Sequence, residues 1–299
     1  MSVRMAYAAG IVWSSIFGLS FLVTKSALAA FRPFELLALR FTLATLALLA
    51  LVAARVIKPQ YRGKPKGILA LVCLFQPVIY FTCETFGVRE TATSTAGLIL
   101  GALPAAVAAL SVPMLNERLS RGQTIGLALS VAGVALVALA GGANGGADTP
   151  HGILLVTGAL ASAAFYNVFS RRASRFYGPV EITLAMMASG AAFFCALALV
   201  QSLVQGGSSA FARATPAAWG AIAYLGLLSS VVAFFLVNLS LARLKASQAS
   251  IFGVLTTLVS LAAGALLRGE SVGPLKALGA AAILVGLWAT NAPEKDQRT

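Results

Sequence analysis

The stretch from Gly87 to Leu139 reads GVRETATSTAGLILGALPAAVAALSVPMLNERLSRGQTIGLALSVAGVALVAL, with apolar runs on both sides of a short polar segment. A second stretch, Leu241 to Thr290, repeats this plan as LARLKASQASIFGVLTTLVSLAAGALLRGESVGPLKALGAAAILVGLWAT. At an offset of 153 residues the copies pair Ala96 with Ala249, Glu117 with Glu270, Gly126 with Gly279, and Gly133 with Gly286. A repeat of this length predicts a chain built from two copies of one structural unit.

The composition places both copies in a membrane. Hydrophobic residues make up 59% of the 299 residues and charged residues 10%, with a mean hydropathy of +0.89. Soluble domains carry about 25% charged residues, and a helix needs about 20 apolar residues to cross a bilayer. The sequence contains ten such runs, at about residues 6–24, 34–54, 67–87, 92–114, 122–140, 152–170, 180–204, 217–238, 246–267 and 274–291. We therefore expect an all-α integral membrane protein with ten transmembrane helices.

Lys and Arg are unevenly distributed between the segments that connect these runs. If the N-terminus is cytoplasmic, 15 of the 22 basic residues lie in inside segments, six lie in outside segments, and Arg40 lies within a run. Cytoplasmic loops are enriched in Lys and Arg, so both termini are predicted to be cytoplasmic. This distribution also accounts for the net charge of +13 without a nucleic-acid partner, because the basic residues form no amphipathic face.

The segment from Gly141 to Gly152, GGANGGADTPHG, contains no Lys or Arg and joins the two halves. We expect a first repeat at residues 1–143 and a second at 144–299, each with five helices. Because five is odd, the second repeat enters the membrane from the opposite side. Such inverted repeats occur in transporters that bind their substrate near the midplane, between the halves. A weaker match pairs Pro33 and Glu35 with Pro179 and Glu181, at an offset of 146.

The repeated unit also resembles a known family. The matching residues are Ala96, Pro104, Asn116-Glu117-Arg118, Gln123, Gly126 and Gly133 in the first copy, and Ala249, Gly269-Glu270, Gly279 and Gly286 in the second. The pattern is similar to the EamA module of the drug/metabolite transporter superfamily over nearly the whole chain. The resemblance implies a carrier of the bacterial inner membrane that exports amino acids or other small metabolites. The second copy has Thr257 in place of Pro104, so a proline kink would be confined to the first repeat.

Polar residues in the run at 67–87 are the first candidates for substrate binding. Gln76, Tyr80 and Glu84 recur every four residues, which would place them on one face of an α-helix. Ionisable residues inside a membrane usually face a cavity or a partner, so we expect this face to line the transport path. The alternative is that Glu84 lies in water at the outer interface. Pro77 removes a helical hydrogen bond beside Gln76 and is expected to bend the helix.

Further candidates come from both halves. Trp13 is expected near mid-membrane, facing either a cavity or the packed helices, and Asn238 serves either the ligand or an interhelical hydrogen bond. The rest of the predicted binding set is Phe17, Leu98, Leu103, Ser162, Phe165, Tyr166, Tyr224, Gln248 and Phe252. This set is rich in apolar and aromatic groups, which suits small amphiphilic substrates. Glu35 and Arg40, five residues apart, are poorly aligned for a direct ion pair, so each should have other partners.

Two acidic residues occupy matching turns of the repeats. We expect Glu117 and Glu270 to accept hydrogen bonds from the N–H groups of neighbouring helix ends, with gating or ion coupling as the alternative. Gly126, Ser130 and Gly133 form a stripe suited to close packing, either between the halves or in a dimer. We expect a monomer or a weak homodimer.

Little in the sequence indicates an enzyme, a cofactor or a metal site. His151 is the single histidine, no HExxH or GxSxG motif occurs, and no GxxxxGK[ST] loop is present for ATP. The resemblance, together with the apolar and aromatic candidate wall, implies a secondary carrier that exports small metabolites, above all amino acids with apolar or aromatic side chains, by alternating access. A multidrug or sugar-type carrier on the same fold is the alternative, and a channel or a membrane enzyme is disfavoured. Small four-helix drug exporters related to the superfamily that this chain resembles use a membrane glutamate in their first helix, and the first run here has none. That resemblance weakens the case for proton antiport and leaves Glu84 as the residue to test.

Overall fold

A computed structural model describes residues 3–115, 121–143, 148–205, 214–244, 252–270 and 273–291, and these contain helices and no strand. The first repeat contains α1 (Val3–Ala27), α2 (Pro33–Ala53), α3 (Lys66–Cys73), η1 (Leu74–Ile79), α4 (Tyr80–Arg89), α5 (Thr93–Leu100), α6 (Leu103–Leu115) and α7 (Arg121–Ala143). The second contains α8 (Pro150–Ala173), α9 (Pro179–Gln205), α11 (Pro216–Ala223), η2 (Tyr224–Ala233), α12 (Phe234–Arg243), α14 (Gly253–Arg268) and α15 (Pro274–Asn291).

Hydropathy and length confirm a multi-pass membrane protein. Seven helical segments of the described chain are long and apolar enough to cross a bilayer. Shorter apolar helices at Thr124–Ala140, Leu255–Arg268 and Pro274–Gly286 fall on three further predicted spans. Together they correspond to the ten runs of the sequence. An even number of crossings leaves both termini on one side of the membrane, in keeping with the predicted topology.

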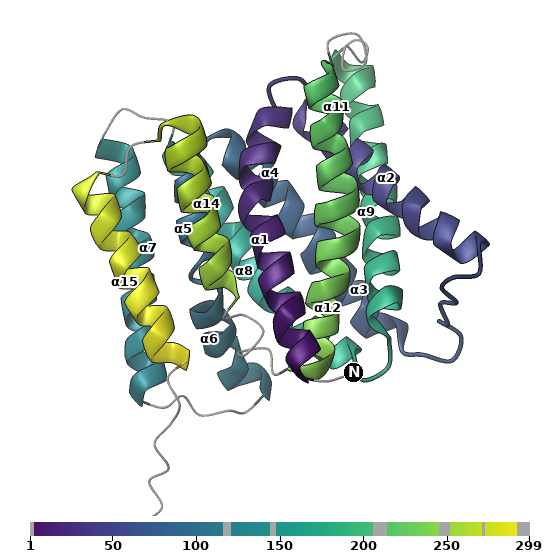
Figure 1. Ribbon diagram of the computed structural model, residues 1–299, viewed down its shortest axis with the longest axis horizontal. Coiled ribbons are helices and arrows are strands. Elements are labelled where there is room, and N and C mark those ends of the chain that lie inside the picture. Colours follow the sequence, from purple (N-terminus) through teal and green to yellow (C-terminus); the bar gives the residue numbers. More distant parts are fainter. Residues whose placement is uncertain are drawn as a thin grey trace, which may run out of the picture.

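The helices pack in pairs that follow the internal duplication. α7 packs along α15 and α2 along α9, so each of these helices meets its own counterpart, and α5 of the fourth crossing packs along α14 of the ninth. The contact of α4 with α8 likewise has a counterpart in the contact of α12 with α1. These relations are those of an approximate two-fold axis. Figure 1 shows α7 beside α15 at the left of the molecule and α2 beside α9 at the right.

The small-residue stripe lies in the contact between the repeats. A Cβ atom added to Gly133 would lie 2.7 Å from the carbonyl oxygen of Gly279, and one added to Gly279 would lie 2.8 Å from that of Gly133. The backbones of α7 and α15 can approach this closely only because neither position has a side chain. Of the two expected uses of the stripe, packing between the halves is the one seen here.

The third crossing is interrupted beside Pro77, where its sequence predicts a bend. Between α3 and α4 the chain forms the π-helical segment η1, in which Gln76 has non-helical torsions (φ −147°, ψ 113°). The peptide bond from Gln76 to Pro77 is cis. Pro77 has no N–H group to donate, so the helical hydrogen-bond pattern is interrupted there. The matching crossing of the second repeat also contains a π-helical segment, η2, which has no proline.

The fourth crossing is interrupted just before Pro104 in the first repeat. α5 ends at Leu100 and α6 begins at Leu103, with Pro104 in the first turn of α6, where a proline is tolerated. In the second repeat α14 continues through Thr257, the residue that aligns with Pro104. At the position of Pro104 the break is therefore confined to the first repeat, as the difference between the copies predicts, and residues 245–251 before α14 lie outside the described chain.

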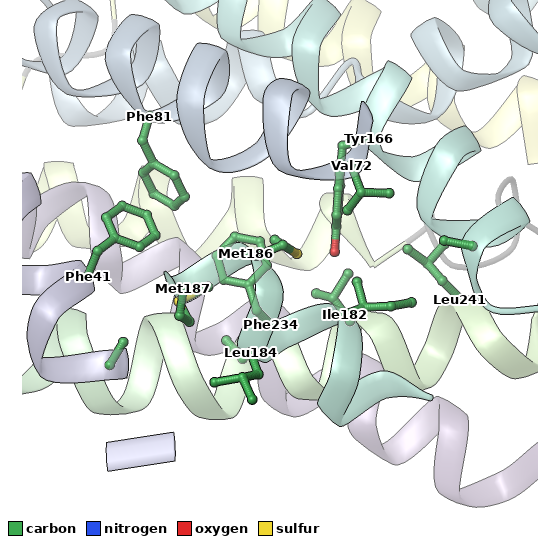
Figure 2. Close-up of a cluster of buried hydrophobic side chains, with 14 of the residues drawn as sticks. Phe41, Val72, Phe81, Tyr166, Ile182, Leu184, Met186, Met187, Phe234 and Leu241 are labelled. Atoms are coloured by element: carbon green, nitrogen blue, oxygen red, sulfur yellow. The ribbon is translucent and has the colours of Figure 1, made fainter. Parts of the chain in front are cut away.

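A cluster of buried side chains packs the two repeats together around α2, α4, α9 and α12. Figure 2 shows the ring of Phe41 next to that of Phe81, and the two rings meet edge to face with their centroids 5.0 Å apart. Phe234 of α12 extends the cluster, with its ring centroid 5.8 Å from that of Phe81. Because Phe81 and Phe234 also line the cavity described next, this packing fixes one of its walls.

Candidate substrate cavity

A cavity of about 80 Å³ lies between the repeats, surrounded by residues of α1, α2, η1, α4, α5, α6, α8, η2, α12 and α14. Both repeats contribute to its wall, as expected for a site near an approximate two-fold axis. Most of its surface is apolar, and a few polar side chains converge on it. This combination is typical of sites that bind small organic molecules.

Seven of the predicted binding residues line this cavity: Trp13, Phe17, Gln76, Tyr80, Glu84, Leu103 and Tyr166. Gln76 and Glu84 are buried, so Glu84 is not in water at the outer interface. Trp13 is 6% exposed, and its indole Nε1 makes no hydrogen bond within the described residues. Gln76, Tyr80 and Glu84 share one wall, although the chain between them is not a regular α-helix.

Six other predicted residues lie outside the cavity lining and serve packing or hydrogen bonding. Leu98 is buried in the core around α5. Phe165 stacks on Phe75 at a centroid distance of 4.7 Å. Phe252 contacts Trp13 edge to face, with their ring centroids 6.0 Å apart. Ser162 donates to the carbonyl oxygen of Phe75 at 2.6 Å and Tyr224 to that of Ile16 at 2.8 Å.

Asn238 is the sixth and is committed to an interhelical network. Its Oδ1 accepts hydrogen bonds from Tyr166 Oη (2.9 Å) and Ser170 Oγ (2.7 Å). Its Nδ2 donates to Thr183 Oγ1 at 3.0 Å. Of its two expected roles, the hydrogen-bonding one is seen here, and it ties α12 to α8 and α9. Gln248, the last member of the predicted set, lies outside the described residues.

The structure adds a charged residue that the predicted set did not contain. Arg40 of α2 is 2% exposed and faces the cavity. Its Nε donates to Ser230 Oγ and its Nη2 to Ser229 Oγ, both at 2.8 Å. The guanidinium carbon lies 4.3 Å from the ring centroid of Phe81, a distance typical of a cation–π contact. An arginine within an apolar run is itself evidence for a functional site.

Arg40 and Glu84 face the same cavity without a direct ion pair in the part of the chain that is described. Glu84 is also 2% exposed, and its Oε2 accepts a hydrogen bond from Thr85 Oγ1 at 3.2 Å. Glu35 does not pair with Arg40 either, because its Oε2 accepts from the backbone N–H of Arg32 at 3.1 Å. The expectation that Glu35 and Arg40 have separate partners is therefore confirmed.

At the predicted outer edge, Glu270 bridges the repeats. Its Oε1 accepts from the N–H of Thr93 and its Oε2 from that of Ser94, each at 2.8 Å, at the start of α5. Burial alone would raise the pKa of Glu270, but hydrogen bonds from Ser94 and Thr93 outweigh it and hold the pKa below its ordinary range. This is the geometry that a capping role requires. Glu117, the matching residue of the first copy, lies outside the described residues.

Comparison with known proteins identifies the family. The model of the EamA-like transporter family matches residues 4–139 and again residues 150–292. The chain belongs to the EamA-like transporter family. It is 34% identical to "Uncharacterized transporter YcxC" of Bacillus subtilis, over 96% of this chain and 92% of that protein. This EamA-like chain is thus a membrane protein of a transporter family with two copies of the EamA unit.

Two more distant relatives have names that mention a substrate. The chain is 27% identical to a "Probable terminal-alkyne amino-acid exporter" of Streptantibioticus cattleyicolor, over 84% of this chain and 82% of that one. It is 25% identical to a "Probable amino-acid metabolite efflux pump" of Salmonella typhimurium, over 91% and 90%. A solved crystal structure has the same fold as this EamA-like chain, with a TM-score of 0.68 over 97% of both chains and 21% identity.

Proposed function

We propose that this protein is a secondary carrier of the bacterial inner membrane that exports amino acids with apolar or aromatic side chains. The observation that carries the proposal is the cavity between the repeats, whose wall is apolar and aromatic apart from a few converging polar groups. Two relatives named as an amino-acid exporter and an amino-acid metabolite efflux pump support this substrate class. The protein would act as a monomer or weak homodimer, with repeats at residues 1–143 and 144–299.

Alternating access would proceed by movement of one repeat against the other around this cavity. The interruptions of the crossings supply places where such movement costs little, because η1, η2 and the break between α5 and α6 already lack regular helical hydrogen bonding. Gln76 and Ser229 lie in the two π-helical segments and line the cavity. A change in either segment would therefore alter the wall around the substrate.

The test is counterflow in liposomes. Purified protein is reconstituted into vesicles loaded with an unlabelled amino acid, and uptake of the same labelled amino acid is followed with and without a pH gradient. Saturable counterflow of phenylalanine or leucine that ignores the gradient would support facilitative export, whereas dependence on the gradient would direct attention to Glu84. Failure of folded protein to exchange any amino acid would refute the substrate class.

A matched pair of variants ties the activity to the cavity. Tyr80 lines the cavity, whereas Tyr224 lies outside its lining and donates to the backbone of Ile16. We expect Tyr80→Phe to change the half-saturating concentration of the amino acid and Tyr224→Phe to leave it unchanged. The multidrug or sugar-type alternative is tested by the same counterflow assay with an aromatic cation and with hexoses. If that alternative is right, the protein exchanges one of these compounds and exchanges no amino acid.

A further inference from the structure

Among the described residues that line the cavity, Arg40 is positively and Glu84 negatively charged, and no salt bridge joins them. Arg40 and Glu84 are each 2% exposed, and within the described residues their hydrogen bonds are to neutral hydroxyl groups: Ser229 and Ser230 for Arg40, and Thr85 for Glu84. Burial of a charge without a close counter-charge is costly. Such residues in membrane proteins mark the path of a substrate or an ion.

The partners of Arg40 orient its guanidinium without neutralising it. A guanidinium has five N–H donors in a planar fork, and Ser229 and Ser230 accept from Nη2 and Nε. No hydrogen bond to Nη1 occurs within the described residues. Phe81 covers one face of the group, so a ligand would approach along the edge where the remaining N–H groups lie. This is the geometry in which arginine binds a carboxylate through two parallel hydrogen bonds.

Glu84 provides the complementary group on the neighbouring helix. Its Oε2 accepts from Thr85, while Oε1 makes no hydrogen bond within the described residues. A carboxylate only accepts hydrogen bonds and an ammonium group only donates them, so an ammonium group is the natural ligand of this oxygen. Glu84 lies one helical turn beyond Tyr80 on the wall that also includes Gln76, whose amide offers further polar contacts.

We propose that Arg40 binds the carboxylate and Glu84 the ammonium group of a zwitterionic α-amino acid. This inference rests on the proposed function and narrows it. The remainder of the ligand, its side chain, would lie against the apolar part of the wall formed by Trp13, Phe17 and Phe234. A zwitterion supplies each buried charge with a close partner of opposite sign. A sugar supplies neither charge, and a cationic drug supplies only the one that Glu84 binds.

A purely structural role for the two residues makes a different prediction. Arg40 joins α2 to η2 through its serine contacts, so its loss would weaken folding or the rate of transport. Such a loss would be the same for every ligand, whatever charges the ligand carries. A change in selectivity between analogues that differ by one charged group therefore distinguishes a role in ligand binding from a structural role.

The decisive experiment uses the wild-type protein in liposomes. Phenylalanine counterflow is competed with phenylalaninamide, which lacks the carboxylate, and with 3-phenylpropanoate, which lacks the ammonium group; a leucine set is run in parallel. We expect each analogue to compete at least about tenfold more weakly than the amino acid, because each leaves a charged hydrogen-bonding group without its partner. If both analogues compete as strongly as phenylalanine itself, the inference is overturned while the proposed function stands. Absence of exchange of any amino acid would overturn both.

Substitutions of Glu84 and Arg40 test which charged group of the ligand each residue binds. Glu84→Gln should reduce the preference for phenylalanine over 3-phenylpropanoate by about tenfold and leave the preference over phenylalaninamide intact, since only the ammonium contact is altered. Arg40→Gln should do the reverse. Tyr224→Phe, outside the cavity lining, should change neither ratio. A uniform fall in rate with unchanged ratios would show a structural role, and if a variant fails to fold, the wild-type analogue series still decides.

Discussion

Replacement of Glu270 tests how the two repeats are held together at the predicted outer edge. The carboxylate is attached to the turn between α14 and α15, and both of its oxygens accept backbone N–H bonds at 2.8 Å from the first turn of α5 in the other repeat. Glu270→Ala removes both acceptors at once. The N–H groups of Thr93 and Ser94 have no earlier helical turn to donate to, so they lose their protein partner.

The expected cost follows from these two hydrogen bonds. A bond to a charged group contributes about 1.5–3 kcal/mol, and loss of an N-cap costs about 0.5–2 kcal/mol. Glu270 is half-buried, so water screens it and replaces part of the loss. We therefore expect Glu270→Ala to destabilise the protein by about 2–3 kcal/mol. Glu270→Gln keeps one acceptor oxygen and should cost about half as much.

The assay is thermal unfolding in detergent, followed by the fraction of monodisperse protein. At roughly 2–4 °C per kcal/mol, Glu270→Ala should lower the apparent Tm by about 4–12 °C and Glu270→Gln by about half of that. The control is Glu90→Gln, whose carboxylate is more exposed and accepts from Thr149 and His151 at the same edge; its loss should cost below about 0.5 kcal/mol. If Glu270→Ala unfolds together with wild type and this control, the capping argument is wrong.

The difference in stability between wild type and Glu270→Ala should also depend on pH, in a direction set by the pKa of Glu270. The pKa of Glu270 is held below its ordinary range in the folded protein because Ser94 and Thr93 donate to the carboxylate against the effect of burial. A depressed folded pKa gives stability that is fully present above the unfolded pKa and is lost as the pH falls through the folded pKa. The difference in Tm between wild type and Glu270→Ala should therefore be constant near neutral pH and shrink in acid. A difference that grows in acid would contradict this reasoning.

Two further predictions concern the cavity and the contact between repeats. Tyr80→Ala and Trp13→Ala should each lower the apparent affinity for the amino acid by roughly tenfold, equivalent to about 1.4 kcal/mol of lost contact, in the counterflow assay; normal affinity in both would show that substrate binds elsewhere. Gly279→Ala should lower stability by about 1–3 kcal/mol in the thermal assay, because the new Cβ would lie 2.8 Å from the carbonyl oxygen of Gly133. Gly220→Ala, with no atom within 4 Å of the new Cβ, is its control and should not destabilise.

The sequence was sufficient to predict the fold because membrane helices reveal themselves by length and hydropathy alone. The ten crossings, the duplication and the one-sided break at Pro104 all follow from residues that can be read in order. Backbone detail was less accessible: the spacing of Gln76, Tyr80 and Glu84 indicated a regular helix, and Pro77 made an interruption there expected without defining its form. The three side chains still share a wall, because η1 continues directly into α4.

The candidate site was only partly predictable, for a physical reason. In a soluble protein the buried face of a helix is its apolar face, but a membrane helix is apolar both toward lipid and toward its neighbours, so its sequence does not show which side faces inward. Leu98 and Phe165 were therefore placed on the cavity wall although they pack in the core and against Phe75. Arg40 was missed as a binding residue because its partners, Ser229 and Ser230, lie about 190 residues away.

The internal duplication accounts for the similar backbone on the two sides of the cavity. A side chain that differs between the two copies is therefore informative about what the cavity binds. At the offset of 146 that equates Glu35 with Glu181, the counterpart of Arg40 is Met186, which is fully buried. Glu35 and Glu181 still do the same work, each accepting a backbone N–H at the start of its helix. A second arginine at position 186 would bring two positive charges toward one axis, and their repulsion in a low-dielectric interior would be severe. The repeats have thus kept their capping residues, while the position that matches Arg40 holds a neutral side chain. In the binding mode proposed above, this asymmetry would give the ligand one preferred orientation in the cavity.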